Sequence, residues 1–399
     1  MTANTALSQR TPFEVLRVFL RLGLTSFGGP IAHLGYFRAE FVTRRGWLDE
    51  RAFADLVALC QFLPGPASSQ VGFAIGLMRA GFSGGLAAWA GFTLPSAIAL
   101  TLFAYGAAAL TGPAGEGLLH GLKLVAVAIV AQAVLGMARS LAPDGPRATI
   151  AVLAIVLMAF APGGFSQIAA IVGGGLAGLL VCRREVGAGL EAGSSPVSRR
   201  AGLVALAAFF VVLALSFLPG RASPLALLAA VYRSGALVFG GGHVVLPLLR
   251  AAVVAPGFVS DSAFLAGYGA AQAVPGPLFT FGAYLGAIAN APPGGIFGAA
   301  LALIAIFAPG VLILMGALPF WRALSVRPEA RAAMAGVNAA VVGLLASALY
   351  NPVWTGAVHN PADFAVAAAG FGALLAWGAP PLVVVALTAA AGVAMGWLG

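Results

Sequence analysis

The chain has 399 residues, of which 61% are hydrophobic and only 8% are charged, and its mean hydropathy is +1.00. A soluble core does not need so much apolar residue, so the composition excludes a soluble globular protein and indicates a bundle of transmembrane helices. The net charge of +9 does not indicate a nucleic acid partner, because the arginines lie at the ends of apolar segments and in short loops, where they act as topology signals.

The first half of the chain, residues 13–182, follows a tail of residues 1–12 that we expect in the cytoplasm. The tail lacks the apolar region of a signal peptide, so no cleavage is expected. The half contains six apolar runs, which lack the alternation of β-barrel strands and therefore predict helices. These segments are 13–35, 52–80, 84–110, 118–140, 148–161 and 166–182.

An arginine-rich linker, residues 183–200, and one connecting span, residues 201–219, separate this half from the second. The linker is expected in the cytoplasm, because positively charged residues favour cytoplasmic loops. The second half, residues 224–399, again contains six apolar segments, at 224–249, 262–290, 294–320, 331–350, 362–377 and 380–398.

The two halves repeat one sequence pattern. "RLGLTSFGGPIAHL" from Arg21 matches "RSGALVFGGGHVVL" from Arg233 at an offset of 212 residues, and "QFLPGP" from Gln61 matches "QAVPGP" from Gln272 at an offset of 211. A near-constant offset indicates two homologous halves. Since a single span joins two six-segment halves, the predicted fold is an all-α polytopic membrane protein whose halves have inverted topology, as in many transporters.

The arginines test this topology. With the N-terminus inside, Arg322, Arg327 and Arg331 fall on the cytoplasmic side, as the positive-inside rule requires. The loop after the first segment also carries four arginines, and it would lie outside if 13–35 crossed the membrane. We therefore favour broken or re-entrant helices for 13–35 and 52–80, which keep that loop in the cytoplasm.

The repeated Pro-Gly-Pro predicts a helix break in each half, because proline removes a backbone donor and clashes with the preceding turn. In the first half one helix is expected to end near Leu63 and the next to begin at Pro66. The first amide groups of that second helix have no helical acceptor and carry partial positive charge, which favours anion binding. "FGGP" (27–30) and "FGGGH" (239–243) predict a second break in each half, and four breaks at membrane depth suggest a central site.

Several side chains near these breaks are candidates for substrate binding. Arg21 and Arg233 each stand six residues before a Phe-Gly-Gly, and an arginine inside an apolar segment is a functional candidate. The alternative is that both reach the interface or set topology, and a packing or capping role competes for the two histidines. The candidates taken from the residues themselves are Arg21, His33, Pro64, Gly65, Pro66, Ser68, Ser69, Gln70, Arg233, Gly240, Gly241, His243, Pro275, Gly276, Pro277 and Thr280.

Enzyme chemistry is not indicated. The sequence has no Walker loop, no HExxH, no GxSxG and no carboxylate pair in a fixed frame. No cluster of cysteine, histidine and carboxylate residues predicts a metal site, so no metal or other cofactor is expected. Helix N-termini, hydroxyl groups and arginines favour an anion as substrate, and the scarcity of acidic residues within the spans argues against a cation.

The stretches "FGGPIAHLGYF", "GWLDE", "CQFLPGPASSQVGFAIG" and "QAVPGP" resemble the chromate ion transporter family in its long, two-half form. The resemblance implies efflux of chromate across the cytoplasmic (inner) membrane and chromate resistance, with sulfate as a related oxyanion. The second half departs from the pattern, because Gly242 stands where Pro30 would fall and Leu278–Thr280 lacks the Ser-Ser-Gln donors. The family's motif residues here are Phe27, Gly28, Gly29, Pro30, His33, Gln61, Pro64, Gly65, Pro66, Gln70, Gln272, Pro275, Gly276 and Pro277.

The residues alone do not distinguish chromate from sulfate, since both are tetrahedral dianions. The alternative function is an importer or exchanger of sulfate-like anions on the same scaffold; a channel and a lipid-modifying membrane enzyme fit less well. A dianion leaving the cell gains roughly 4.6 kcal/mol per 100 mV of membrane potential, so we expect the potential alone to drive export. Coupling to protons or a counter-anion stays open, as does a homodimer, and membrane lipid is the expected surrounding.

Overall fold

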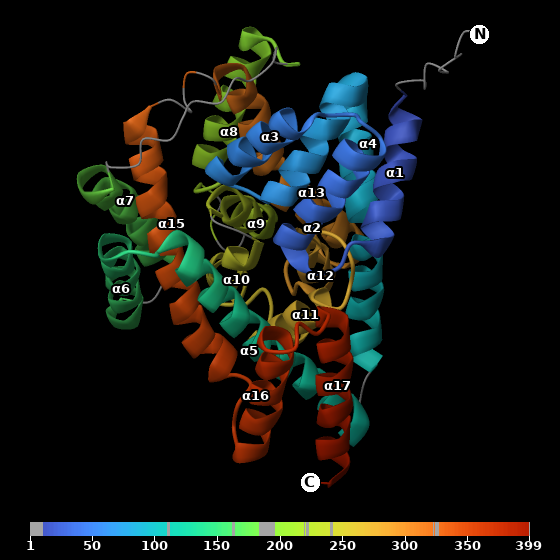
Figure 1. The fold of residues 1–399 in the computed structure, drawn as a ribbon. Coiled ribbons are helices and arrows are strands. Elements are labelled where there is room, and N and C mark those ends of the chain that lie inside the picture. The colour runs from blue at the N-terminus through green and yellow to red at the C-terminus, as the bar shows by residue number, and fades with distance from the viewer. Residues whose placement is uncertain are drawn as a thin grey trace.

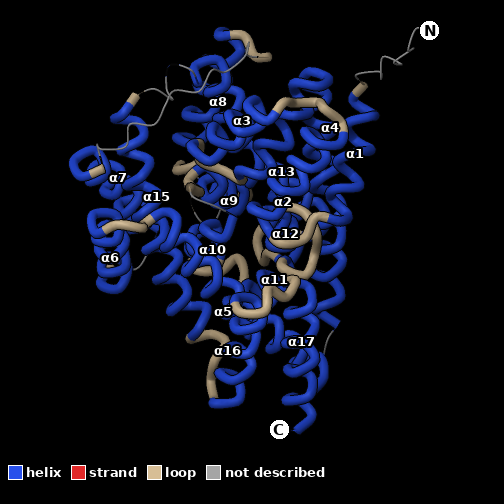
Figure 2. The backbone as a smooth tube through the Cα atoms, in the orientation of Figure 1, coloured by secondary structure: helices blue, strands red, loops and turns tan. Residues whose placement is uncertain are grey.

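The structure is a computed structural model, and it describes residues 11–109, 112–161, 164–182, 196–218, 220, 223–239, 242–321, 323 and 327–398. Within these ranges every regular element is a helix, which confirms the predicted all-α class (Figure 2). The linker 183–200 falls mostly outside the described residues.

The first half contains the predicted helices, with its first two segments broken. The 13–35 segment divides at Ser26–Gly28, and the 52–80 segment divides at Leu63–Pro66. The third segment continues directly from the second, across a kink at Ala80 and Gly81 where the backbone is not helical. The helices are α1 (Pro12–Thr25), α2 (Gly29–Phe37), α3 (Glu50–Phe62), α4 (Ala67–Ala109), α5 (Gly112–Leu141), α6 (Gly145–Phe160) and α7 (Gly164–Val181).

The second half repeats this order after the connecting helix α8 (Arg199–Leu215). Its first two segments are also divided, because the 224–249 and 262–290 segments each form two short helices. The helices are α9 (Ala226–Ala236), α10 (Val245–Val253), α11 (Asp261–Ala271), α12 (Phe281–Ile288), α13 (Gly295–Ala317), α15 (Pro328–Ala348), α16 (Pro361–Leu375) and α17 (Pro381–Leu398), with short 3-10 helices at Gly242–Val244 and Leu278–Thr280.

The helices fall into long and short ones. Among the described residues, the helical stretches Ala67–Ala107, Gly112–Leu141, Gly295–Phe320 and Pro328–Trp354 are long and apolar enough to cross a membrane. By contrast, α1 has 14 residues and α3 has 13, so each is about 20 Å long and does not cross a hydrocarbon core of about 30 Å. The lengths of α1 and α3 therefore agree with the broken, partly inserted helices that the arginine pattern favoured.

The two halves exchange their last hairpins. α6 and α7 of the first half pack on α15 of the second, whereas α16 and α17 of the second half pack on α5 of the first (Figure 1). Since α5 and α15 are repeat equivalents, each half covers the fourth segment of the other. At the α5–α16 contact, His120 Nε2 lies 2.7 Å from the buried carboxylate oxygen Oδ1 of Asp363.

Small residues permit these crossings. A Cβ placed on Gly121 of α5 would lie 2.3 Å from the carbonyl oxygen of Thr388 on α17, and one on Gly336 of α15 would lie 2.0 Å from that of Gly174 on α7. The two glycines match in the repeat, so the same close helix contact is formed twice with the halves exchanged.

Aromatic rings hold the first-half break in place. Phe37 of α2 packs edge-on against Phe92 of α4 with ring centroids 5.1 Å apart, and Phe19 of α1 stacks on Phe41 at 4.9 Å. These side chains are almost fully buried. They fix α1 and α2 against the long helix α4, which positions the break between them.

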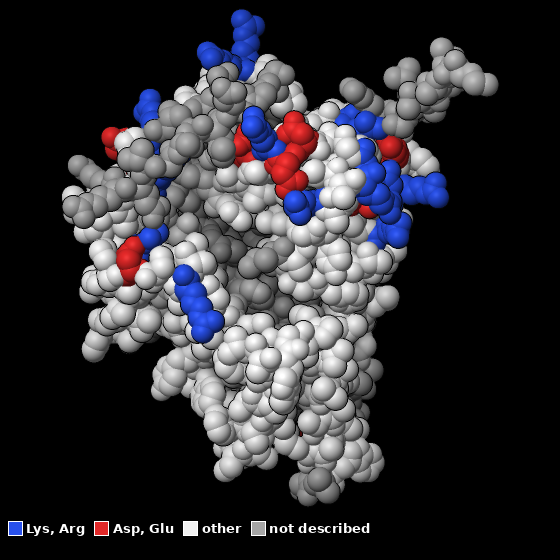
Figure 3. Space-filling model, in the orientation of Figure 1, with Lys and Arg blue, Asp and Glu red and all other residues white. Residues whose placement is uncertain are grey.

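The ends of the molecule differ in charge. α1 begins at one end, the upper end in Figure 1, and α17 finishes at the opposite end. On the face drawn in Figure 3 most charged side chains lie over the upper part, with others at the left and left of centre at mid-height, whereas the lower part, formed by α16 and α17, is nearly free of them. α5 rises toward the upper left from the lower end, and its equivalent α15 descends from the upper end (Figure 1).

Candidate functional site

Glycines form the breaks of the first half. Gly28 and Gly29 have φ values of 98° and 76°, and Gly65, between the two prolines, has φ 119°. These positive values fall where side chains other than hydrogen are strained, so glycine allows the chain to leave one helix and start the next. α3 ends at Phe62 and α4 begins at Ala67, which confirms the predicted break.

The second half breaks at the matching places. α11 ends at Ala271, and Gly276 has φ 94° before the short 3-10 helix that leads into α12. α9 ends at Ala236 and α10 begins at Val245. Gly240 and Gly241, both candidates from the sequence, lie outside the described residues.

The breaks of the two halves hydrogen-bond to each other. The N–H of Gly65 donates to the carbonyl oxygen of Val238, 2.7 Å away, and the N–H of Gly276 donates to that of Ser26, 2.9 Å away. Val238 and Ser26 are repeat equivalents, each directly before a Phe-Gly. Each Pro-Gly-Pro is therefore bound to the Phe-Gly-Gly break of the other half, and we call this pair of contacts the reciprocal clasp.

Each long helix contacts the clasp next to a proline within the helix. These prolines are Pro95 of α4 and Pro309 of α13. Gln70 Nε2 donates to the carbonyl oxygens of Pro64 and Gly310, each at 2.9 Å, and so joins the first-half break to α13. A Cβ on Gly276 would lie 3.0 Å from the carbonyl oxygen of Phe92, so the second-half break lies against α4, just as the first-half break lies against α13. Gln70 is thus a structural tie between the halves.

A cavity of about 60 Å³ lies beside the clasp, room for a few water molecules. Its wall combines the first Phe-Gly-Gly break with the second Pro-Gly-Pro break, and it contains no acidic residue among the described lining. His243 Nδ1 lies 2.8 Å from the hydroxyl oxygen of Tyr268. The lining residues are Gly28, Gly29, Pro30, Ile129, Gln132, His243, Ala271, Gln272, Val274, Gly276, Leu278 and Pro381.

Several buried polar atoms of these breaks have no partner within the described residues. Nε2 of Gln272, which lines the cavity, is an unpaired donor, and the hydroxyl oxygens of Ser26 and Ser69 are unpaired as well. A buried polar group without a partner costs about 1–3 kcal/mol, so the Gln272 Nε2 donor at the cavity suits a bound acceptor such as an anion. Gln70 Oε1, beside the first Pro-Gly-Pro, is an unpaired acceptor and does not line the cavity.

His33 is occupied in the structure. Its Nε2 lies 3.2 Å from the carbonyl oxygen of Ser26, and its Nδ1 lies 3.3 Å from the hydroxyl oxygen of Ser68. Because a carbonyl oxygen only accepts, Nε2 donates to it, and in the neutral ring Nδ1 then accepts from Ser68. The ring also packs edge-on against Phe92 at 5.1 Å, so His33 links α2, the first break and the start of α4.

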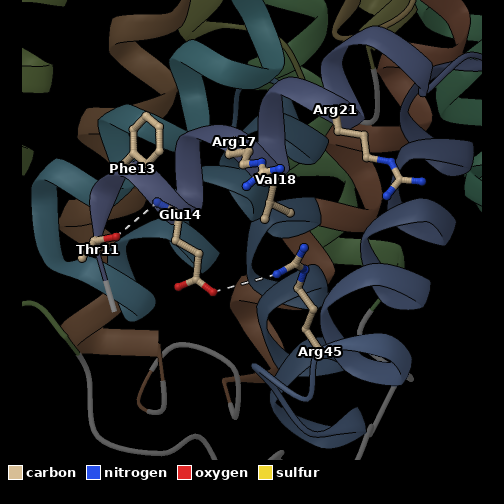
Figure 4. Close-up of a pocket in the computed structure, with 7 residues that line it drawn as sticks. All are labelled: Thr11, Phe13, Glu14, Arg17, Val18, Arg21 and Arg45. Carbon is tan, nitrogen blue, oxygen red and sulfur yellow. Dashed lines mark hydrogen bonds and ion pairs between the residues drawn. The ribbon is translucent and has the colours of Figure 1, made fainter. Parts of the chain in front are cut away.

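The two candidate arginines do not line the cavity. Arg21 is exposed on α1, where it lines a separate pocket with Arg17 and Arg45 (Figure 4). Arg233 donates to the carbonyl oxygen of Ser216 at the end of α8, and its guanidinium lies 5.1 Å from the centre of the Phe217 ring. A helix C-terminus attracts a cation, which explains the position of Arg233.

Two further candidate residues do not offer their side chains to the cavity. Gln61 is exposed at the end of α3, unlike its equivalent Gln272. The hydroxyl group of Thr280 donates to the carbonyl oxygen of Pro277 at 2.8 Å, so it is already used within its own turn. The remaining candidates, Phe27, Pro64, Pro66, Pro275 and Pro277, shape the breaks.

Sequence reasoning missed the contributions of α5 and α17 to the cavity. Ile129 and Gln132 come from α5, and Pro381 begins α17. Nothing local marks these residues, because exchange of the hairpins brings α17 to the break. Pro95 and Pro309 were also missed, although they match at an offset of 214 residues and the repeat could have shown them.

Comparison with known proteins identifies the family. The sequence model of the family "Chromate transporter" matches the chain twice, at residues 13–179 and 225–393. The chain is 29% identical to the chromate transport protein of Pseudomonas aeruginosa, over 95% of this chain and 90% of that protein. It is 26% identical to a probable chromate transport protein of Synechococcus elongatus, over 84% of this chain and 83% of that protein.

A third relative is the chromate transport protein of Cupriavidus metallidurans, 25% identical over 84% of this chain and 81% of that protein. No solved structure matches the chain. Both matches to the family model are to a membrane transporter, not to an enzyme, and the apolar helices agree with a multi-pass membrane protein. The family model covers both halves, and the chain therefore belongs to the chromate transporter family.

Proposed function

We propose that this protein exports chromate, a tetrahedral dianion, from the cytoplasm and so confers chromate resistance. The observation that carries the proposal is the family match over both halves, together with relatives named as chromate transport proteins. The clasp supplies the physical support, since it gathers helix breaks, an unpaired donor and a cavity with no acidic side chain among its described lining.

We place the substrate at the breaks, where backbone dipoles replace its water. α2 starts at the cavity, where Gly28, Gly29 and Pro30 form part of the wall, and its first amide groups have no helical acceptor, so that end carries about half a positive charge. α4 starts at the other break of the first half, outside the cavity lining. Gln272 adds an uncharged donor. Uncharged donors suit transport, because they bind a dianion without holding it as tightly as paired arginines would.

The unequal burial of two equivalent breaks supports alternating access. Leu63 and Gly65 are buried in the first half, whereas their equivalents Val274 and Gly276 are half-buried beside the cavity. The halves enter with opposite direction, as the paths of α5 and α15 support. We propose that the two breaks exchange these states, which would open the site first to one side of the membrane and then to the other.

We assign the charged end, where α1 begins, to the cytoplasm. Positively charged residues favour that side, and the arginines near the starts of α1, α8 and α15 lie there (Figure 3). α17 would then finish outside. Alkaline phosphatase fused after residue 398 should be active, and an inactive fusion beside an active one in the linker would reverse the assignment.

Gln272→Leu tests the site. It removes the unpaired donor in the cavity while keeping the size of the side chain, and a hydrogen bond to a charged group is worth about 1.5–3 kcal/mol. We expect chromate uptake into everted membrane vesicles to fall about tenfold or more. Gln61→Leu changes the repeat equivalent, which is exposed outside the cavity in this state, and because the two breaks exchange states it should slow transport as well.

Both variants are compared at equal amounts in the membrane. Equal, undiminished transport by both would remove the site from this break. Uptake of labelled sulfate, measured beside that of chromate, distinguishes the two candidate substrates. If sulfate enters the vesicles and chromate does not, the protein carries sulfate-like anions instead.

A further inference from the structure

The pocket around Arg21 lies on the outside of α1, away from the clasp. It has a volume of about 590 Å³ and is lined by Thr11, Phe13, Glu14, Arg17, Val18, Arg21 and Arg45 (Figure 4). We propose that it binds the phosphate headgroup of an anionic phospholipid. The proposal is independent of the transported substrate.

The charges of the pocket leave an excess of arginine. The guanidinium groups of Arg17 and Arg21, one helical turn apart, form no ion pair or side-chain hydrogen bond with any described residue. Glu14 is the single acidic lining residue, and it is already neutralised by Arg79 at 3.1 Å. Two guanidinium groups without a described partner therefore lie on one face and can bind an anion, and phosphate matches their planar donors.

Arg45 forms the opposite wall. Its Nε donates to Glu40 at 2.6 Å, and its NH1 lies 3.9 Å from Glu14. These contacts hold the side chain over the pocket from the loop side, while Arg17 and Arg21 approach from α1 (Figure 4). The pocket also includes the start of α1, where the helix dipole is positive, although Thr11 Oγ1 already caps the Glu14 N–H.

Apolar side chains on the same face of α1 favour a lipid over a free anion. Phe13, Leu20 and Leu24 are 73%, 42% and 56% exposed, and with Arg17 and Arg21 they follow helical spacing along one stripe. An exposed apolar stripe on a membrane helix faces acyl chains. Arginines at the end of such a stripe hold the headgroup while the chains lie along the helix.

This assignment also accounts for an arginine inside an apolar segment. Arg21 is the tenth of the 14 residues of α1, about 13 Å along the helix from its first residue, and its long side chain shortens the distance to the headgroup level. A lipid phosphate there would hold the half-length helix α1 at the interface. Lipid binding is thus a positioning role for the element that carries the first break.

The test is binding of short-chain phosphatidylglycerol to the purified protein in a neutral detergent, followed by native mass spectrometry. Two basic residues at a membrane surface contribute about 1 kcal/mol each, so R17Q/R21Q should weaken binding by about tenfold or more. The control R199Q/R200Q removes two exposed arginines at the start of α8 and should bind as the wild type does.

Three results would overturn the proposal. These are unchanged binding by R17Q/R21Q, equal loss in the control variant, and displacement of the lipid by inorganic phosphate at the same concentration, which would show a site for free anions. A shift of R17Q/R21Q from dimer to monomer without loss of lipid would assign the face to a second copy of the chain. The melting temperature checks that both variants are folded.

Discussion

Gly65 is the residue whose conformation the clasp needs most. Its φ of 119° is strained for any residue with a Cβ, and a Cβ there would lie 3.0 Å from both the Cα of Gly310 and Nε2 of Gln70. We expect Gly65→Ala to cost about 1–3 kcal/mol of stability and to abolish most transport, because the clasp must open to admit the methyl group. Thermal unfolding in detergent and vesicle uptake measure the two effects.

Gly378→Ala is the matched control for this prediction. Gly378 also has a positive φ, 59°, but a Cβ there would meet nothing within 4 Å. Its substitution should strain the backbone slightly and leave transport unchanged. Equal transport by both variants would show that the clasp is not part of the transport cycle.

Residues could be predicted from the sequence where their effect is local. Proline and glycine fix backbone geometry within a few residues, so the breaks at Pro64–Pro66 and Pro275–Pro277 were predicted correctly. The arginines were different. Whether Arg233 faces the site or the end of α8 depends on where α8 packs. The residues around Arg233 in the sequence do not indicate the position of α8.

At the scale of elements, the crossing of α5 and α17 depends on the absence of side chains. Gly121→Ala should destabilise the protein by about 1–3 kcal/mol, because the new Cβ would lie 2.3 Å from the Thr388 carbonyl oxygen. At Gly136, on the same helix, an added methyl group would meet nothing within 4 Å, so Gly136→Ala should be neutral or slightly stabilising. Melting temperatures of the two variants decide; equal values would contradict the close crossing.

Elements were predictable to within a few residues, but their partners were not. The apolar runs gave the helices of both halves, since length and hydropathy are properties of the run itself. The exchange of the hairpins α6–α7 and α16–α17 joins segments far apart in sequence. Small residues such as Gly174 and Gly336 show that a close contact exists, but not which helix makes it.

At the scale of the whole molecule, the membrane potential favours the proposed export of a dianion. The inside of the cell is negative, so an outgoing dianion gains roughly 4.6 kcal/mol per 100 mV. At about 1.4 kcal/mol per tenfold change, this sustains a concentration ratio of roughly a thousandfold without any coupled ion. No described lining residue of the cavity is acidic, so the structure offers no carboxylate there to carry a coupled proton.

We therefore expect the potential alone to drive the protein. In energised everted vesicles the interior is positive, and chromate uptake should stop when valinomycin with potassium removes the potential. It should continue when nigericin removes only the pH gradient. Vesicles with Gln272→Leu give the background. Uptake that survives loss of the potential but stops with the pH gradient would instead show proton coupling. The proton carrier would then have to lie outside the cavity. The described lining of the cavity contains a histidine, which is hydrogen-bonded to Tyr268, but no carboxylate.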